Sequence, residues 1–431
     1  METSPRGLVR AIRRWDLTAL AVNSIIGAGI FGLPSEVFKR IGVYSLFAFI
    51  ACALVVALIV LCFAEVSSRF SGTGGPYLYA REAFGPLAGF EVGWLIWIAR
   101  LTAFAANCNL LVGYLGFLFP GADQGAGRVL TILVVVLGLV AVNYTGVRNA
   151  ALTSNVLTVA KLVPLTLLIG VGLFFLQGER FALGPRPPFA AFSVSVLLLI
   201  FAFSGFEMAV IPGGEVRNPG RDMPHALLTA VGFVAVFYFL IQVVAIGTLP
   251  GLADSARPLA DAGRTFLGRA GGAIISAGAL VSILGNLNVI ILVGSRLPFA
   301  MAERGELPGV LAKTHPVYRT PHIAVLLSGA VALVLTLKGS FVNAATLSVI
   351  ARLLSYGVTC AALPVLRRRQ GAPPAAFTTP AGPVVALAAL LLSAWLLSHV
   401  ALAQAREAGI AILLGLLLYF LPRLLRRRVA G

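Results

Sequence analysis

Long apolar stretches constrain the fold of this chain more than any other feature. A helix that crosses the hydrocarbon layer of a membrane needs roughly 20 apolar residues, and a window of that length finds about twelve such stretches. They run approximately over 17–38, 44–69, 87–119, 129–146, 152–176, 192–215, 225–249, 270–301, 321–337, 341–366, 383–402 and 410–425. Because hydrophobic residues make up 59% of the chain and charged residues 11%, a soluble domain is excluded. We expect an all-α polytopic membrane protein.

The formal net charge of +17 is spread between the apolar stretches and does not form one patch. Its main clusters are Arg6, Arg10, Arg13 and Arg14, then Arg367, Arg368 and Arg369, and finally Arg423, Arg426, Arg427 and Arg428. Placed on one side with the even-numbered connections, they give that side roughly twice as many Lys and Arg residues, which is typical of cytoplasmic loops. We therefore expect an even number of spans, both termini in the cytoplasm and no nucleic-acid partner. The excess of arginine over lysine favours a G+C-rich prokaryotic genome, hence a bacterial plasma (inner) membrane.

Two of the apolar stretches are interrupted. The first contains Gly27-Ala28-Gly29, and the sixth contains Ser204-Gly205 followed by Pro212-Gly213-Gly214. Interrupted spans at corresponding positions of two halves indicate a transporter site built by inverted repeats. We expect a 5+5 inverted repeat whose broken helices 1 and 6 each open one half. The expected segments are a cytoplasmic tail at 1–16, the first repeat at 17–176, the second repeat at 192–366, two further helices at 383–425 and a basic tail at 426–431.

An interrupted helix leaves backbone groups without partners inside a membrane, where each costs several kcal/mol unless it lines a polar cavity or is buried in protein. The start of the second half-helix suits a carboxylate, and carbonyls at the end of the first suit an ammonium group. One zwitterionic amino acid satisfies both. The alternative is that these glycines only allow close helix packing. Residues 27–32 also match G-x-G-x-x-G, but a nucleotide site requires a preceding strand, so we reject it.

Several motifs occur in a fixed order over about the first three-quarters of the chain. They are Asn23–Phe31, Phe63–Val66, Gly74–Tyr77, Phe201–Glu207, Glu215–Pro224, Ser295-Arg296 and Ala300–Pro308. With these motifs the sequence resembles the amino acid–polyamine–organocation (APC) transporters. The resemblance implies a 5+5 inverted repeat, alternating access and amino acid transport.

The resemblance also implies that the interrupted backbone binds the substrate. The carboxylate is expected at the N–H groups of Ala28 and Gly29, and Phe201 is expected to act as an aromatic gate, the alternative being ordinary packing. The carbonyls expected to hold the ammonium group belong to Ile25, Phe201, Ala202 and Ser204. The full expected substrate-binding set is Ile25, Ile26, Gly27, Ala28, Gly29, Phe201, Ala202, Phe203, Ser204 and Gly205.

Four ionisable residues are embedded in the apolar stretches, where charge is costly and usually functional. Lys161 resembles the family's fifth-helix lysine, whose ammonium group takes the place of a sodium ion. We expect it to replace a coupling cation and to exchange protons; the alternative is a lysine that reaches the nearby interface. Glu207, Arg100 and Arg352 form either an ion-paired gate or a static network, and the sequence does not determine which of them pair.

Polar residues of the eighth span offer another arrangement. Ser282, Asn286 and Asn288 are candidates for a sodium site if Lys161 is not used, and otherwise make interhelical hydrogen bonds. Glu65, near the cytoplasmic edge of the second span, is expected to pair with the loop that follows it.

We expect secondary active transport of neutral amino acids by proton symport, with exchange or a cationic amino acid or polyamine substrate as alternatives. A lipid-processing membrane enzyme would need acid/base or metal-binding clusters, whereas the 16 Asp and Glu residues are mostly isolated. A channel would need rings of charge or carbonyls. We therefore expect no enzyme activity, no metal and no cofactor.

The four cysteines, Cys52, Cys62, Cys108 and Cys360, lie inside apolar stretches and are interpreted as small hydrophobic residues. The loop 120–127 has no cysteine, so we expect no disulfide-linked subunit. The expected partners are an amino acid and the lipid bilayer, and the expected state is a monomer or homodimer.

Overall fold

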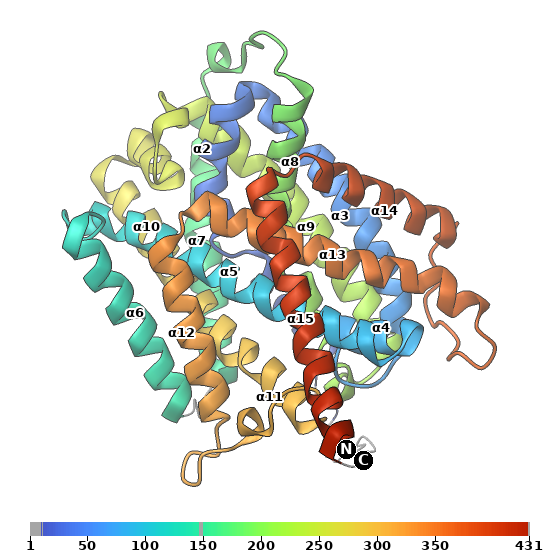
Figure 1. The fold of residues 1–431 in the computed structure, drawn as a ribbon. Coiled ribbons are helices and arrows are strands. Elements are labelled where there is room, and N and C mark those ends of the chain that lie inside the picture. The colour runs from blue at the N-terminus through green and yellow to red at the C-terminus, as the bar shows by residue number, and fades with distance from the viewer. Residues whose placement is uncertain (1–9, 11, 146–149, 430–431) are drawn as a thin grey trace.

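The computed structural model describes Arg10, residues 12–145 and residues 150–429, with the backbone alone for 150–160 and 421–429. Nearly all of its regular structure is helical (Figure 1). The α-helices are α1 (Arg14–Ile25), α2 (Gly29–Ile41), α3 (Ser45–Ser68), α4 (Pro76–Phe84), α5 (Pro86–Leu118), α6 (Gly125–Thr145), α7 (Ala150–Gly172), α8 (Phe189–Phe203), α9 (Pro219–Thr248), α10 (Pro258–Gly294), α11 (Arg296–Glu303), α12 (His322–Lys338), α13 (Phe341–Arg368), α14 (Gly382–Ser398) and α15 (Leu402–Val429). The 3₁₀ helices are η1 (Gly42–Tyr44), η2 (Leu173–Phe175), η3 (Gly178–Phe181), η4 (Phe206–Val210), η5 (Gly213–Glu215), η6 (Leu252–Asp254) and η7 (Gly309–Ala312).

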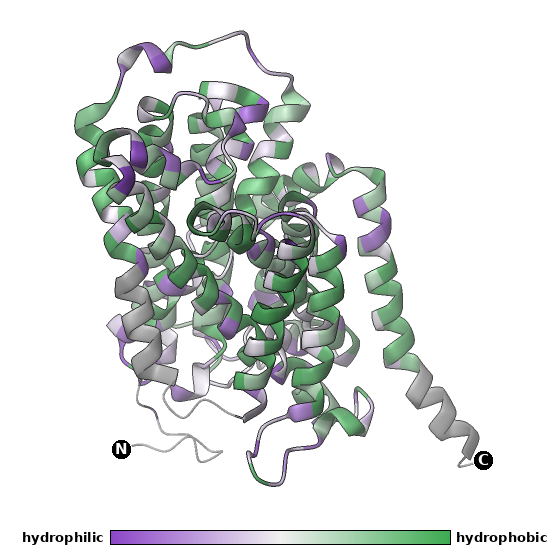
Figure 2. Cartoon of the chain, turned by 90° about the vertical axis from the view of Figure 1, so that its left-hand side faces the viewer, coloured by the Kyte–Doolittle hydropathy of each residue, from purple (hydrophilic) through white to green (hydrophobic). Residues whose placement is uncertain are grey.

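The helices confirm the all-α membrane architecture. In the described chain, 8 helical segments are long and apolar enough to cross a membrane, and shorter apolar helices add to them. Large apolar side chains point outward from these helices, for example Leu54, Val134 and Val236, each 63% exposed. Figure 2 shows hydrophobic helices with the hydrophilic residues gathered mainly towards the connections. An apolar surface of this kind is stable in contact with lipid and not in contact with water.

Three boundaries differ from the sequence-based expectation. Helix α4 is absent from the expected spans because its nine residues are too short for a membrane-length window. The eighth span begins at Pro258, bends at Gly268 (φ 64°, ψ −159°) and ends at Gly294, where α11 follows. Charged residues before Gly268 lowered the local hydropathy and hid this first part of α10. Helix α15 likewise begins at Leu402, earlier than the expected position near 410.

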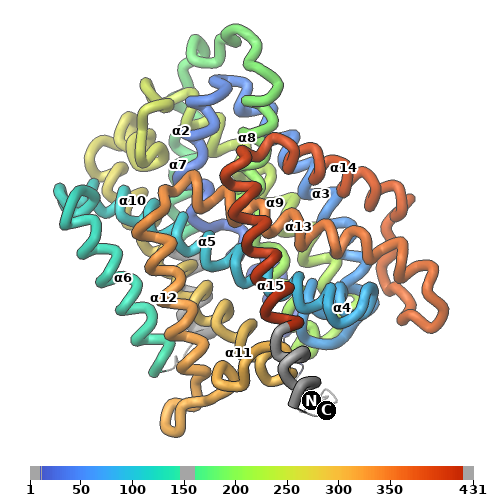
Figure 3. The backbone as a smooth tube through the Cα atoms, in the orientation of Figure 1, coloured from blue at the N-terminus to red at the C-terminus, as the bar shows by residue number. Residues whose placement is uncertain are grey.

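The interrupted helices lie at the centre of the helix packing. Helix α5 packs against α10 and α13, α3 packs against α8 and α9, and α2 packs against α8. Helices α6 and α12 lie side by side at the edge of the molecule, and α15 crosses over α5 and α13 (Figures 1 and 3). Peripheral helices therefore shield a polar centre from lipid.

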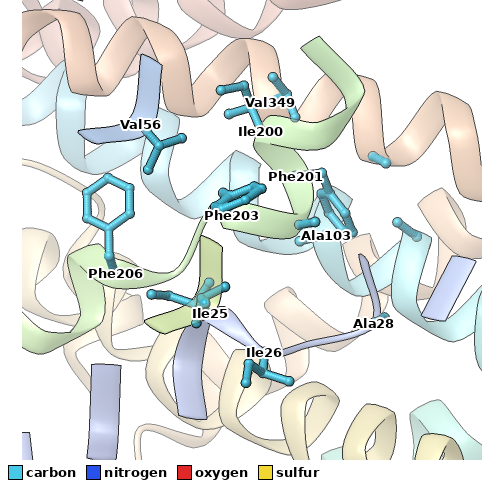
Figure 4. Packing of buried hydrophobic residues seen from close by; sticks show 14 of the residues in the cluster. Ile25, Ile26, Ala28, Val56, Ala103, Ile200, Phe201, Phe203, Phe206 and Val349 are labelled. Carbon is cyan, nitrogen blue, oxygen red and sulfur yellow. The ribbon is translucent and has the colours of Figure 1, made fainter. Parts of the chain in front are cut away.

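The first interruption separates α1 from α2. Helix α1 ends at Ile25, and Ile26 leaves the helical region with φ −71° and ψ 89°. Figure 4 shows the chain passing Ala28 as a thin, non-helical segment before α2 begins. A Cβ atom on Gly29 would lie 2.7 Å from the Cα of Ala202. Glycine is therefore required where this segment crosses the end of α8.

The second interruption follows α8. Ser204 is extended (φ −80°, ψ 160°), and Gly205 takes a positive φ of 115° that favours glycine. A Cβ atom on Gly205 would lie 2.2 Å from the carbonyl oxygen of Ser24. The two interruptions thus contact each other backbone to backbone, and the prediction that both helices break here is confirmed.

Candidate functional site

A cavity of about 60 Å³ lies between the two interruptions. A volume of this size corresponds to roughly two water molecules at their liquid volume, so any solute that fits it in this conformation is small. Its walls come from both broken helices and from α5, α10 and α13. The lining residues are Ser24, Ile25, Gly27, Ala28, Gly29, Arg100, Ala103, Asn107, Phe201, Ser204, Gly205, Glu207, Met208, Asn286, Val289, Ile290 and Arg352.

Most of the residues expected from the sequence line this cavity, and three do not. Ile26 and Phe203 are fully buried in the hydrophobic core beside it (Figure 4). Ala202 lies behind Gly29. Phe201 lines the cavity and packs edge-to-face against Phe341, with ring centroids 6.1 Å apart. The backbone carbonyls of Ile26 and Ala202 accept hydrogen bonds from Lys161 and Tyr238, respectively.

The interrupted backbone offers donors and acceptors of opposite character. The amides of Ala28 and Gly29 lie at the start of α2, where a helix supplies no acceptors for its own first turn. Carbonyls lie at the ends of α1 and α8, where a helix leaves acceptors free and carries partial negative charge. The cavity therefore presents positive and negative backbone poles within one small space.

Protein hydroxyls already reach three of the four carbonyls that the resemblance assigned to an ammonium group. The Tyr238 hydroxyl lies 3.1 Å from the Ile25 carbonyl oxygen and 3.3 Å from that of Ala202. The Ser204 hydroxyl donates to the Phe201 carbonyl at 2.8 Å. A carbonyl oxygen has two lone pairs, so each retains capacity for another donor. The sequence analysis missed Tyr238; the signal was a tyrosine within the apolar run of α9.

The Lys161 ammonium group lies against the first interruption. It donates to the carbonyl oxygen of Asn23 and, at 2.6 Å, to that of Ile26. The side chain is 3% exposed and lines a second cavity of about 70 Å³, which shares Ser24, Asn286 and Val289 with the first. Lys161 thus sits among carbonyls that are otherwise suitable ligands for a metal cation.

The structure determines which of the embedded charges pair. Arg352 donates to Oε1 of Glu207, while the Tyr356 hydroxyl donates to Oε2 at 2.7 Å. The amide of Gly205 donates to the same Oε2 at 2.9 Å. Glu207 therefore fastens the second interruption to α13, through an ion pair that is buried on both sides.

Arg100 makes no such pair within the described part of the chain. Its side chain is buried, with 3% of the residue exposed, and its Nη2 donates to the Met208 sulfur. Its Nε has no hydrogen-bond partner. A thioether is a weak acceptor, so this guanidinium group is incompletely satisfied at the wall of the cavity.

The asparagines of α10 have different roles. Asn286 lines both cavities and accepts a hydrogen bond from Asn107 of α5 at 2.9 Å. Asn288 accepts from Asn143 of α6 at 2.8 Å, which is an interhelical contact. Asn107 was not expected as a lining residue, although a polar residue in an apolar run was a visible signal. Among the described residues, no group of three or more His, Cys, Asp and Glu side chains is placed to hold a metal.

Contacts near the start of α1 tie neighbouring segments together. The backbones of Ile12 and Val216 form an isolated parallel β-bridge, and Arg14 forms an ion pair with Asp222 at 3.1 Å.

Glu65, near the end of α3, is the centre of a separate cluster. Its carboxylate accepts hydrogen bonds from Arg69, from Arg367 at 2.6 and 2.7 Å, and from the amide of Thr379. The expectation that Glu65 pairs with the segment after its helix holds for Arg69, the first residue after α3, while Arg367 of α13 and the amide of Thr379 before α14 are further partners from elsewhere in the chain. Arg6 and the side chains of the four closing arginines lie outside the described residues.

An all-helical membrane protein with a polar cavity at two interrupted helices has the architecture of a secondary transporter. The amino acid permease family model matches residues 12–414. The chain is 29% identical to the serine/threonine exchanger SteT of Bacillus subtilis (strain 168), over 96% of this chain and 97% of the relative. It is 29% identical to the methylthioribose transporter of that organism, over 97% and 95%, and 26% identical to its branched-chain amino acid permease BcaP, over 96% and 93%.

This chain therefore belongs to the amino acid permease family. The resemblance to the APC superfamily is confirmed, and the protein is an integral membrane transporter and not an enzyme.

Proposed function

We propose that this transporter carries amino acids by alternating access, as a proton-coupled symporter in the plasma membrane with both termini in the cytoplasm. The observation that carries the proposal is the contact of two interrupted helices around one small polar cavity. Interrupted backbone at the membrane midplane is stable only where a cavity or ligand satisfies it. In this proposal the two repeats at 17–176 and 192–366 move relative to each other around the cavity.

The head group of the amino acid supplies the missing backbone partners. Its carboxylate binds the amides of Ala28 and Gly29 at the positive end of α2. Its ammonium group binds the carbonyls at the ends of α1 and α8, sharing them with the hydroxyls of Tyr238 and Ser204. Both ends of the substrate are then recognised by backbone, which any amino acid can satisfy.

Lys161 acts as the coupling group in this proposal. Its ammonium group holds two carbonyls of the first interruption together, as a bound sodium ion would. Loss of its proton would release those carbonyls and change the geometry of the substrate site. Asn23, Ile26, Ser282 and Asn286 surround it in the described structure, and none of them titrates near neutral pH. Its proton is therefore the mobile charge of this cavity.

Two sets of contacts serve as gates. Phe201 covers the cavity beside Phe341, and the Glu207–Arg352 pair ties the second interruption to α13. The Arg14–Asp222 pair and the Ile12–Val216 bridge join segments near the start of α1, the end that this proposal assigns to the cytoplasm. Opening towards the cytoplasm would require the cytoplasmic contacts to separate.

An amino acid with a cationic side chain is a poor substrate for this cavity. The single carboxylate among the lining residues, Glu207, is already bound by Arg352, Tyr356 and the amide of Gly205. This occupancy favours amino acids without a cationic side chain over cationic amino acids or polyamines. The cavity volume further favours small ones.

Amino acid exchange is a second candidate, favoured by the similarity to a protein named as a serine/threonine exchanger. Symport and exchange differ in whether the empty carrier can return across the membrane. An exchanger requires an amino acid on both sides, whereas a symporter accumulates substrate in empty vesicles. We propose a monomer or homodimer without a disulfide-linked subunit for either mode.

Uptake into proteoliposomes tests the proposal. Purified protein is reconstituted into vesicles without internal amino acid, and uptake of labelled amino acids is measured with and without an inward proton gradient. Saturable uptake that rises with the gradient is expected. Uptake that occurs only with internal amino acid would identify an exchanger instead, and no saturable uptake of any amino acid would contradict the proposal.

Matched glycine variants test the role of the interruption. Gly29→Val places a side chain against Ala202, whereas Gly170→Ala in α7 meets open space. We expect the first variant to lose saturable uptake and the second to retain it. Equal uptake by both would contradict recognition by the interrupted backbone.

A further inference from the structure

The charges around the cavity do not balance. Among its lining residues, Arg100 and Arg352 are cationic and Glu207 is anionic. Glu207 is engaged by Arg352 and lies outside ion-pair distance of Arg100. One positive charge therefore remains at the wall of a cavity inside the membrane. An uncompensated buried charge is costly, and such groups are normally paired.

Arg100 carries this excess charge on α5. It is 3% exposed, its Nε has no partner, and its Nη2 contacts a sulfur that accepts hydrogen bonds weakly. A guanidinium group presents five donors in a planar fork that matches a carboxylate. Arg100 is thus an incomplete anion site, formed before any ligand arrives.

Arg100 lines the cavity from α5, whereas the backbone groups proposed for the head group belong to the interrupted helices. The amides of Ala28 and Gly29 and the carbonyls at the helix ends are sufficient for the head group of an amino acid. Of the three charged lining residues, Glu207 and Arg352 engage each other, and Arg100 has no carboxylate within ion-pair distance in the described part of the chain. Arg100 is therefore the charged group of the lining that is available to a substrate side chain.

We propose that the preferred substrate is an amino acid with an acidic side chain, whose carboxylate binds Arg100. A zwitterion is neutral overall and leaves the excess charge unbalanced, whereas an amino acid with net charge −1 neutralises it. A side-chain amide has nearly the same shape as the acid but lacks the charge that strengthens its hydrogen bonds to a guanidinium group. The inference rests on the proposed function and specifies an acidic amino acid in place of the neutral one expected from the sequence.

Isosteric pairs of amino acids test this inference. Binding of L-aspartate, L-asparagine, L-glutamate and L-glutamine is measured with purified protein, and each amino acid is then tested for uptake into proteoliposomes. We expect the acid of at least one pair to bind about tenfold or more tightly than its amide. Equal or weaker binding of both acids, together with saturable uptake of amides, would overturn the inference and leave the proposed function standing. Failure to take up any amino acid would overturn the proposed function itself.

Variants of Arg100 separate recognition from stability. Arg100→Gln should abolish the preference for the acid and bring the ratio of the two dissociation constants close to one, while Arg100→Lys should retain part of it. A purely structural role would weaken acid and amide equally in Arg100→Gln and leave their ratio unchanged. Arg186→Gln, at an exposed position between η3 and α8, is the matched control and should leave this ratio unchanged.

The same measurements in chloride and in gluconate buffers test whether Arg100 binds a small inorganic anion in place of a substrate carboxylate. An acid preference that persists without chloride supports the proposal. Neutral amino acid binding that requires chloride, with no acid preference, would assign Arg100 to chloride and overturn it.

Discussion

Single residues at the two interruptions hold conformations and contacts that few replacements allow. Gly205 combines a positive φ with direct contact to the Ser24 carbonyl. Lys161 replaces missing backbone donors at the first interruption with its ammonium group. Glu207 receives three protein donors at the second. Each residue acts on backbone that a continuous helix would satisfy by itself.

Gly205→Ala should destabilise the protein and abolish transport. A non-glycine residue at this φ costs roughly 1–3 kcal/mol, and the new methyl group would overlap the carbonyl of Ser24. We expect the free energy of unfolding to fall by about 2 kcal/mol or more. Thermal unfolding in detergent measures the change, with Gly170→Ala as the control that should leave Tm unchanged. A Tm equal to that of the unchanged protein would show that the interruption tolerates a side chain.

Lys161→Ala should reduce substrate affinity and flatten the pH dependence of uptake. The variant loses two charge-assisted hydrogen bonds, each worth roughly 1.5–3 kcal/mol, so we expect at least about a tenfold rise in the dissociation constant. Uptake is measured in proteoliposomes from mildly acidic to mildly alkaline pH. Lys338→Ala, at the exposed end of α12, is the control and should retain the original profile. Unchanged pH dependence in Lys161→Ala would exclude this residue from proton coupling.

At the scale of helices, the interrupted helices α1, α2 and α8 lie opposite longer helices across the cavity. Helices α1 and α2 pack on α9 and α8, while α5, α10 and α13 form the opposing walls. The Arg14–Asp222 ion pair joins segments at the end of the molecule where α1 begins, with Arg14 partly exposed and Asp222 buried. Pairs of this kind contribute little energy, which suits contacts that must separate in each transport cycle.

Arg14→Ala should shift the conformational equilibrium towards opening on the side where α1 begins. An ion pair with one partly exposed member is worth up to about 1 kcal/mol, which corresponds to roughly a fivefold change in population. Alkylation of Ser24→Cys, placed in the cavity lining, by a membrane-impermeant reagent added from that side reports the opening. We expect faster labelling in Arg14→Ala and a return to the slower rate when Arg14→Asp is combined with Asp222→Arg. Equal rates in all variants would show that this pair does not act as a gate.

At the scale of the whole molecule, helix burial increases from the lipid-facing helices to the centre. Helix α6 and residues 402–420 of α15 expose most of their surface, whereas α5 and α8 are largely buried. Arg100, Lys161, Glu207 and Arg352 are buried charged residues beside the two cavities of this interior. Such residues are stable there because neighbouring helices supply partners and exclude lipid.

The arrangement of spans predicts that both ends of the chain face the cytoplasm. Basic residues cluster at both ends and between α13 and α14, and the positive-inside rule places these segments in the cytoplasm. A fluorescent reporter fused after residue 431 should therefore be active. A reporter that requires export should be active when inserted at 182–188, between α7 and α8. Export-dependent activity at the C-terminal fusion would reverse the proposed topology.

Sequence alone determined the membrane class, the order of the spans and the position of both interruptions, because hydrophobic length and glycine placement act locally. It also placed Lys161, Glu207, Arg100 and Arg352 inside the membrane. Only the tertiary structure decided that Glu207 pairs with Arg352, that Arg100 has no carboxylate within ion-pair distance among the described residues, and that Tyr238 reaches both interruptions. These contacts join residues that are far apart in the chain, and their geometry depends on how the helices pack and turn relative to one another. Hydropathy and local spacing carry no information about that rotation.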